Sequence, residues 1–251
     1  MIEVRDVSKS YGEALVVDGV SLDLPKGGVT SIIGPNGAGK STLLSMISRL
    51  LPMSHGTVKV DGLDVTTTRG DVLARRLSIL RQDNQLGSRL TVRDLVAFGR
   101  YPYSRDRPTA DDRQRVDQAL AFLDLEPLAH RFLDELSGGQ RQRAFVAMVL
   151  CQDTGYALFD EPLNNLDMRH AVAMMGILRE AADRFGKTIV LVLHDINFAS
   201  CYSDHIVAMK EGRLAFQGKP AEIMREDVLS AIFDTRINIH EVEGRRIAVF
   251  Y

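Results

Sequence analysis

The sequence has 251 residues, 45% of them hydrophobic and 25% charged, so it is long enough to bury the core of one large domain. Its 31 Lys and Arg residues nearly balance its 33 Asp and Glu residues, which argues against nucleic acid as a main partner. The strongest apolar run, residues 188–193, is too short to cross a bilayer. If the protein works at a membrane, we expect another polypeptide to supply the membrane part.

The N-terminal part of the chain predicts antiparallel strands. Residues 2–12, 16–27 and 56–65 are short β-like runs that end in Asp and Gly turns. Among them, residues 29–51 run from an apolar strand through a glycine-rich loop into a segment with the apolar spacing of a helix. A strand, loop and helix of this kind are therefore expected to interrupt the antiparallel region.

The middle of the chain, residues 91–133, is predicted to be mostly helical. Residues 91–100 and 110–125 have the spacing of amphipathic helices. The polar residues 101–109 between them include two prolines and are expected to form a loop.

Beyond residue 143, helices and buried strands alternate. Residues 143–152 and 171–186 are predicted helices, and residues 156–161 and 188–194 are continuous apolar strands. Such strands, alternating with helices, predict a parallel sheet that is covered on both faces. Residues 240–251 are expected to form a closing hairpin.

A glycine-rich loop carries the strongest functional signal. Residues 34–41 fit the pattern G-x-x-x-x-G-K-[ST], between a predicted strand and a predicted helix. Such a loop turns its N–H groups towards phosphate oxygens, while Lys40 reaches the β- and γ-phosphates and the Ser41 hydroxyl reaches Mg²⁺. A chance glycine turn would not explain the flanking elements. The residues expected to bind nucleotide here are Gly34, Asn36, Gly37, Gly39, Lys40, Ser41 and Thr42.

Acidic and polar residues at strand ends complete a candidate catalytic site. Asp160 is expected near the magnesium ion, and Glu161 is placed to deprotonate an attacking water. His194 ends the other buried strand and is a candidate sensor of the γ-phosphate, and Gln82 is a candidate for reaching the metal or the water. Exposed acids and a satisfied polar histidine are the alternatives, and the phosphate loop favours the catalytic interpretation. No N-K-x-D element supports guanine recognition.

Residues 136–143, with the sequence LSGGQRQR, open a predicted helix with two glycines, Gly138 and Gly139. Each costs about 1 kcal/mol relative to alanine in a helix interior. Ser137 and Gln140 have the spacing of a capping box. The glycines leave the first-turn N–H groups open, which predicts a second anion-binding surface. One nucleotide can use both surfaces if two chains face each other.

In this order, the motifs resemble those of the ATPase subunits of ABC transporters, over essentially the whole chain. Residues 34–42 resemble the Walker A motif, residues 156–162 Walker B, residues 136–140 the ABC signature, and residues 164–167 the D-loop. The resemblance also makes His194 the switch histidine and Gln82 the Q-loop glutamine. It further implies that Tyr11 stacks on adenine and that Asp167 contributes to the nucleotide site.

The resemblance implies an α/β fold of the P-loop NTPase class. In it, a RecA-like parallel-sheet core carries an N-terminal antiparallel β subdomain and a helical subdomain. The whole chain, residues 1–251, is then one nucleotide-binding domain with the helical subdomain at about residues 84–150. Arg81 and Leu163 stand where many relatives have proline and threonine, and neither change removes a catalytic group.

The same resemblance implies cofactors, partners and a location. ATP and Mg²⁺ are expected between two copies of the chain. The signature residues Ser137, Gly138, Gly139 and Gln140 are expected to bind the partner's ATP, with Ser137 and Gly139 in contact with its γ-phosphate. The expected partners are integral membrane permease subunits and, indirectly, an extracytoplasmic substrate-binding protein, without nucleic acid. The chain is expected to lie peripherally on the cytoplasmic face of the bacterial inner membrane.

The transported substrate is suggested by two segments. Residues 98–112 and 194–214 resemble those of importers of ferric siderophores, haem and cobalamin, and a ferric siderophore importer is the favoured interpretation. Import of haem or cobalamin, a soluble ABC ATPase outside transport, and a nucleotide-gated subunit without turnover stay open as alternatives. Residues 220–251 carry no motif that can be interpreted.

Overall fold

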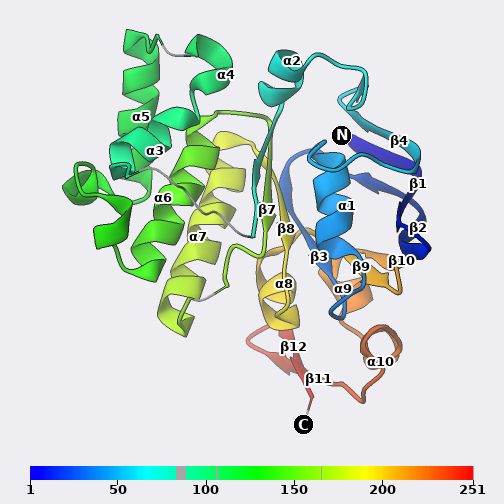
Figure 1. Cartoon of the computed structure of the whole chain (residues 1–251). Coiled ribbons are helices and arrows are strands. Elements are labelled where there is room, and N and C mark those ends of the chain that lie inside the picture. Colours follow the sequence, from blue (N-terminus) through cyan, green and yellow to red (C-terminus); the bar gives the residue numbers. More distant parts are fainter. Residues whose placement is uncertain (83–88, 106, 165, 251) are drawn as a thin grey trace.

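The computed structural model describes residues 1–82, 89–105, 107–164 and 166–250. A central six-stranded sheet separates two sides of the molecule, with α6 and α7 on one side and α1 on the other (Figure 1). Its strands, in spatial order, are β10 (Arg213–Gly218), β9 (His205–Lys210), β3 (Gly28–Ile33), β8 (Thr188–Val192), β7 (Tyr156–Asp160) and β6 (Leu77–Leu80). The neighbours from β9 to β6 run parallel, as predicted, and β10 pairs with β9 in the antiparallel direction.

The predicted antiparallel region is also present, beside α1. Its strands, in spatial order, are β2 (Ala14–Leu24), β1 (Ile2–Tyr11), β4 (His55–Val60) and β5 (Leu63–Asp64). The predicted closing hairpin consists of β11 (Asn238–Val242) and β12 (Arg245–Val249). Within the described part of the chain, no helix is both long and apolar enough to cross a bilayer.

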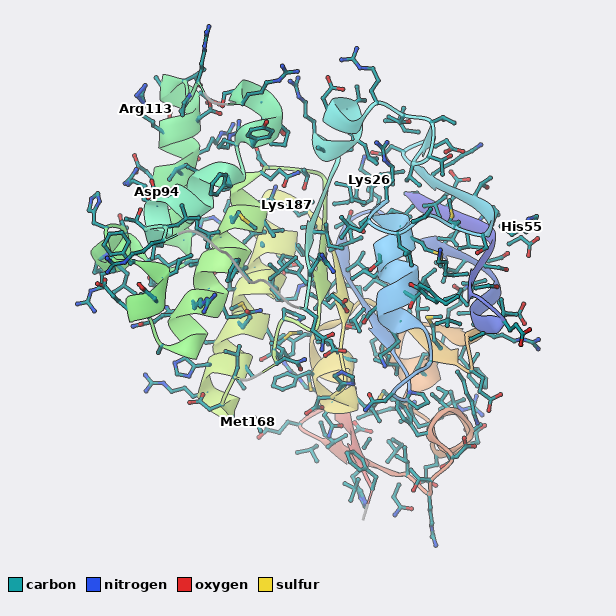
Figure 2. All side chains as sticks on the ribbon, viewed as in Figure 1. Lys26, His55, Asp94, Arg113, Met168 and Lys187 are labelled. Atoms are coloured by element: carbon teal, nitrogen blue, oxygen red, sulfur yellow. The ribbon has the colours of Figure 1, made fainter. Side chains whose placement is uncertain are left out.

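The helices fall into groups along the chain. Figure 2 labels Asp94 and Arg113 in the helical group and His55 in the antiparallel sheet, on opposite sides of the molecule. The helices are α1 (Lys40–Ile47), α2 (Gly70–Ala74), α3 (Val92–Phe98), α4 (Tyr101–Ser104), α5 (Ala110–Phe122), α6 (Gly138–Cys151), α7 (Met168–Phe185), α8 (Ile196–Tyr202), α9 (Pro220–Ile223) and α10 (Glu226–Phe233), with short 3-10 turns at Glu126–Leu128 and Leu133–Glu135.

The continuous apolar strands are explained by burial on both faces of the central sheet. In β7, Tyr156 and Leu158 pack in the core that contains α1, whereas Ala157 and Phe159 pack in the core that contains α6 and α7. Successive side chains of a strand point to opposite faces, so a strand that is covered twice has no polar positions in its middle. The pairing of β3 with β8 and of β8 with β7 places the residues that follow β7 and β8 beside the loop that follows β3.

One predicted loop is wrong. Residues 101–109 were expected to form a loop, yet Tyr101–Ser104 form α4. Pro102 lies in the first turn of this helix, where the missing N–H costs nothing. The turn is held by tertiary contacts, because the buried Arg100 guanidinium lies 3.9 Å from the ring centroid of Tyr103 and donates to Asp112.

Candidate nucleotide-binding site

The loop between β3 and α1 has the geometry of an anion site. α1 begins at Lys40, and no side chain caps its first turn, so its N-terminal N–H groups are left for a ligand. Gly39, at the N-cap, has a left-handed backbone with φ 89°. A Cβ there would lie 2.8 Å from the carbonyl oxygen of Val16, and a Cβ on Gly34 would lie 2.1 Å from the carbonyl oxygen of Met209. Both positions therefore require glycine.

Lys40 is buried and lies over this loop. Its Nζ donates to the carbonyl oxygens of Gly34 and Pro35, each at 2.9 Å. Burial lowers the pKa of Lys40, and the nearby carboxylates of Glu161 and Asp160 oppose that shift. The Lys40 ammonium is thus held close to the acidic side of the site. Phosphate oxygens can replace the two carbonyl oxygens as its hydrogen-bond acceptors.

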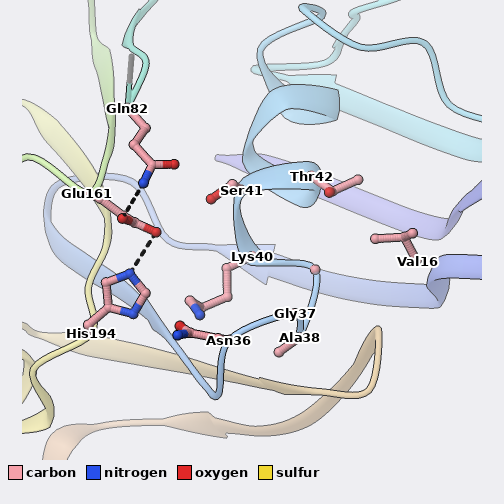
Figure 3. A pocket seen from close by; sticks show the side chains of 11 residues that line it. Val16, Asn36, Gly37, Ala38, Lys40, Ser41, Thr42, Gln82, Glu161 and His194 are labelled. Carbon is pink, nitrogen blue, oxygen red and sulfur yellow. Dashed lines mark hydrogen bonds and ion pairs between the residues drawn. The ribbon is translucent and has the colours of Figure 1, made fainter.

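The loop lines a cavity of about 390 Å³ into which side chains from several elements project (Figure 3). Its lining residues are Val16, Asn36, Gly37, Ala38, Gly39, Lys40, Ser41, Thr42, Gln82, Glu161 and His194. A second hollow of about 360 Å³ adjoins it and shares Ser41, Thr42 and Gln82 with it. Tyr11 lines this second hollow and is half-exposed, so its ring is accessible to a ligand that extends beyond the phosphates.

Asp160 and Ser41 lie at the edge of the cavity. The Ser41 hydroxyl donates to Oδ1 of Asp160 at 2.7 Å. Burial raises the pKa of Asp160; the hydrogen bond from Ser41 opposes this, and the neighbouring Glu161 carboxylate adds to it. A buried acid beside a second, partly buried one needs positive charge. Hydroxyl and carboxylate oxygens are ligands that Mg²⁺ prefers, so these residues fit that ion.

No group of three or more His, Cys, Asp or Glu side chains arranged for a metal is found among the described residues. A magnesium ion here would therefore depend on ligand oxygens from the phosphates. That is how Mg²⁺ is commonly held in nucleotide sites, with one or two protein carboxylates.

Glu161 is the most constrained side chain of the site. Its backbone is left-handed, with φ 52°, a conformation that non-glycine residues adopt mainly where the surroundings enforce it. Gln82 Nε2 donates to its carboxylate at 2.8 Å, and His194 Nε2 lies 2.7 Å from the other carboxylate oxygen. Asn164 also donates to it. The register of β7 and β8, with Asp160 opposite Val192, brings these residues together.

Asn164 was not among the residues expected in the site from the sequence. The only sequence feature that pointed to Asn164 was the motif at residues 164–167, and this motif does not show which carboxylate the Asn164 amide contacts. Of the same motif, Asp167 caps α7 by accepting from the His170 N–H at 2.9 Å, and Asn165 lies outside the described residues.

The glycine pair at the start of α6 has the predicted capping box. The Gln140 N–H donates to Oγ of Ser137 at 3.3 Å, and the Ser137 N–H donates to Oε1 of Gln140 at 3.1 Å. A Cβ on Gly138 would meet nothing within 4 Å, whereas one on Gly139 would lie 3.1 Å from the His170 ring. Gly138 is therefore open to a ligand, and Gly139 makes room for a histidine of the same chain.

The signature residues lie apart from the phosphate cavity of their own chain. Ser137, Gly138, Gly139 and Gln140 are all described, and none of them lines that cavity. The start of α6 therefore lies on a surface away from that cavity, and the second anion-binding surface expected from the sequence stays a prediction.

Comparison with known proteins gives consistent matches. Residues 17–164, more than half of the chain, match the family model described as ABC transporter. The chain is 51% identical over 251 residues to the petrobactin import ATP-binding protein YclP of Bacillus subtilis, with all of both chains covered. It is 52% identical over 250 residues to the petrobactin import ATP-binding protein FatE of Bacillus anthracis, again with full coverage of both.

A solved structure agrees with these matches. The dimeric ATP-binding cassette MJ0796, in a post-hydrolysis state bound to ADP and phosphate, superposes with a TM-score of 0.78 at 30% identity. The match covers 88% of this chain and 99% of that cassette.

Proposed function

This chain belongs to the ABC transporter family, and we propose that it is the ATP-hydrolysing subunit that powers import of a ferric siderophore through a separate membrane permease. One observation carries the choice of substrate. Two relatives that match over their full length, at 51% and 52% identity, are both named as petrobactin import ATP-binding proteins. Petrobactin is therefore the first siderophore to test.

ATP binding is assigned to the two adjoining hollows. The phosphates would lie in the cavity of the glycine loop, where Lys40 and the uncapped start of α1 supply positive charge. The adenine would extend into the hollow lined by Tyr11, whose exposed ring offers a stacking surface. Ser41 and Thr42 border both hollows and would contact the phosphates between these two ends.

Mg²⁺ would be held by Ser41 and Asp160, with Gln82 as a further ligand, and it would neutralise charge that develops on the phosphates. The hydrogen bond between Ser41 and Asp160 keeps the two oxygen ligands together. Gln82 lies beside Glu161, so one amide can link the metal side of the site to the catalytic carboxylate.

Glu161 is the proposed general base. Its carboxylate lines the cavity opposite the phosphate loop and accepts from Gln82, which fixes its direction. His194 approaches the other carboxylate oxygen and would orient Glu161 and contact the γ-phosphate. The water proton would pass to Glu161 as the water oxygen attacks phosphorus, with ADP as the leaving group.

A second copy of the chain is proposed to complete the site. The start of α6 is open at Gly138 and lies outside the phosphate cavity of its own chain, so its N–H groups and Ser137 can reach ATP on a facing copy. Closure of such a dimer on ATP, and reopening after hydrolysis, would drive the permease by population shift. The related dimeric cassette supports this arrangement.

The permease is proposed to dock on the helical subdomain, expected at about residues 84–150. Phe98 and Tyr101, in and beside α3, are each about half-exposed and offer apolar contact for a short helix of the partner. The segment after Gln82 was also expected to take part, and residues 83–88 of it lie outside the described residues. The chain would then lie on the cytoplasmic face of the cell membrane, and a substrate-binding protein would deliver the siderophore from the other side.

The test is transport by the assembled complex. The chain should co-purify with a membrane permease, and the complex in vesicles should take up ferric petrobactin only with ATP and the matching binding protein. Uptake of haem or cobalamin in place of ferric siderophores would move the substrate assignment to those alternatives. Co-purification with ribosomes, without a permease, would overturn the transport function, and absence of phosphate release would overturn the ATPase.

A further inference from the structure

Asn197, in the first turn of α8, forms a paired contact with the C-terminal hairpin. Its Nδ2 donates to the carbonyl oxygen of Ala248 at 3.1 Å, and its Oδ1 accepts from the Ala248 N–H at 2.7 Å. The amide thus pairs with the backbone of one residue of β12 much as a neighbouring strand would. Ala248 is buried, so losing Asn197 would leave two buried backbone groups without these partners.

The same residue is tied to the turn that carries His194. The backbone N–H of Asn197 donates to Oδ1 of Asp195 at 2.7 Å, and the N–H of Phe198 donates to the same oxygen at 3.1 Å. Asp195 is therefore the N-cap of α8, and it directly follows His194. β8 ends at Val192, and the Leu193 N–H donates a further hydrogen bond to the carbonyl oxygen of Ile32 in β3 at 3.1 Å. His194 lies one residue beyond that bond, so its position depends both on the sheet before it and on how α8 is held after it.

The hairpin is a firm support for this contact. An isolated two-stranded hairpin is marginally stable, but β11 and β12 are anchored to the body of the protein. The Arg246 side chain donates to the carbonyl oxygen of Ala221 at 2.5 Å, at α9. The Ile239 N–H donates to Oε1 of Glu226, at the start of α10, at 3.0 Å.

We propose that Asn197 is a positioning residue for ATP hydrolysis, which uses the C-terminal hairpin as a fixed support to hold His194 against Glu161. Continuous contacts connect Ala248 to Asn197, Asn197 to Asp195, and His194 to Glu161. Residues 220–251, which carry no motif, thereby gain a role in catalysis. The proposal rests on the proposed ATPase function, and its test uses a complex whose wild-type form hydrolyses ATP.

The test replaces Asn197 by leucine, which has a similar volume and lacks both hydrogen-bonding groups. In the permease-bound dimer, Asn197→Leu should lower kcat about tenfold. We expect only part of the free energy of the two lost hydrogen bonds to appear in the rate, because the rest lowers the stability of the fold. The affinity for ATP should stay within about twofold, because Asn197 does not line the phosphate cavity. Asn197→Ala also removes both hydrogen-bonding groups and introduces no apolar side chain of similar volume, so it should lower kcat in the same direction and protects the test against a leucine variant that fails to fold.

A double-mutant cycle separates positioning from general stability. If Asn197 acts through His194, Asn197→Leu in a His194→Ala background should change the residual rate less than about twofold. Ser200→Ala is the matched control, since its hydroxyl donates to the carbonyl oxygen of Arg246 at 2.7 Å, on the same hairpin but one turn further along α8. It should leave kcat within about twofold.

Two results would overturn the proposal. One is an unchanged kcat in a folded Asn197→Leu complex. The other is an equal fractional loss with and without His194, since that would describe a structural contact with no link to the histidine. Failure of the wild-type complex to hydrolyse ATP would instead count against the proposed function itself.

Discussion

Replacing Ser137 by glutamate tests whether the start of α6 binds the ATP of a second copy. The change removes a cap, which costs about 1 kcal/mol, but a carboxylate at a helix N-terminus recovers about 0.3–1 kcal/mol. Folding should therefore change little. In a closed dimer, a carboxylate about 4 Å from a phosphate charge, at an effective dielectric of about 20, costs about 4 kcal/mol. That energy corresponds to about a thousandfold loss of turnover.

The assay compares phosphate release by the permease complex with ATP binding by the isolated chain. Ser137→Glu should abolish most turnover, yet it should leave ATP affinity of the single chain unchanged, because Ser137 does not line that chain's phosphate cavity. Ser137→Ala removes the cap and the hydroxyl proposed to reach the partner's ATP without adding charge, so it should reduce turnover by about 10–100-fold, less than Ser137→Glu does. Full-speed hydrolysis by Ser137→Glu would refute the shared site. An equal loss of ATP affinity in the isolated chain would place the signature in its own chain's site instead.

Three further predictions concern the base, the phosphate loop and the helical subdomain. Glu161→Gln should lower hydrolysis by about 10²–10⁴-fold while ATP-dependent dimers persist in size-exclusion chromatography, and a rapid variant would exclude Glu161 as base. Lys40→Ala should weaken ATP binding at least about tenfold in a fluorescent-nucleotide titration, and unchanged affinity would contradict its assignment. Arg100→Ala leaves the buried Asp112 without its guanidinium partner at 2.9 Å. It should lower the free energy of unfolding by about 3–5 kcal/mol, measured by thermal unfolding. Burial opposes ionisation of Asp112, but hydrogen bonds from Thr109 and Arg100 lower its pKa below the ordinary value. The ionised Asp112 therefore contributes fully to the free energy of unfolding above about pH 4, and this contribution is lost as the pH falls further. The free energies of unfolding of the wild type and Arg100→Ala should then become more similar in acid.

Features that depend on neighbouring residues could be predicted from the sequence. The residues that form the phosphate loop are close in sequence, and so are Ser137 and Gln140 of the capping box. The structure has both features at the predicted positions. The parallel sheet followed from strands that are apolar throughout, because such strands need cover on both faces.

Features that depend on tertiary contacts could not be predicted. Asn164 reaches Glu161 through a turn with no periodicity, and α4 forms because Arg100 is fixed against Asp112 and Tyr103. Secondary-structure propensity alone assigns the proline-containing segment to a loop, because propensity does not include the contacts of the buried Arg100. From the sequence, His194 was a candidate sensor of the γ-phosphate, and its contact with Glu161 was not predicted, because that contact requires two strands to be neighbours in a register that only the fold determines.

The charges of the site support the proposal that a second chain completes it. Each catalytic group already has an internal partner: Lys40 binds loop carbonyls, Ser41 binds Asp160, and Glu161 contacts His194. ATP would exchange these contacts for new ones, so hydrogen bonds alone add little affinity. Lys40 faces two acids, Asp160 and Glu161, and ATP brings further negative charge. We therefore expect additional positive charge from a divalent cation and from helix N-termini, and the uncapped start of α1 is one of these. The start of α6, which is open at Gly138, lies outside the cavity, and we propose that it supplies its N–H groups to the site of a facing copy.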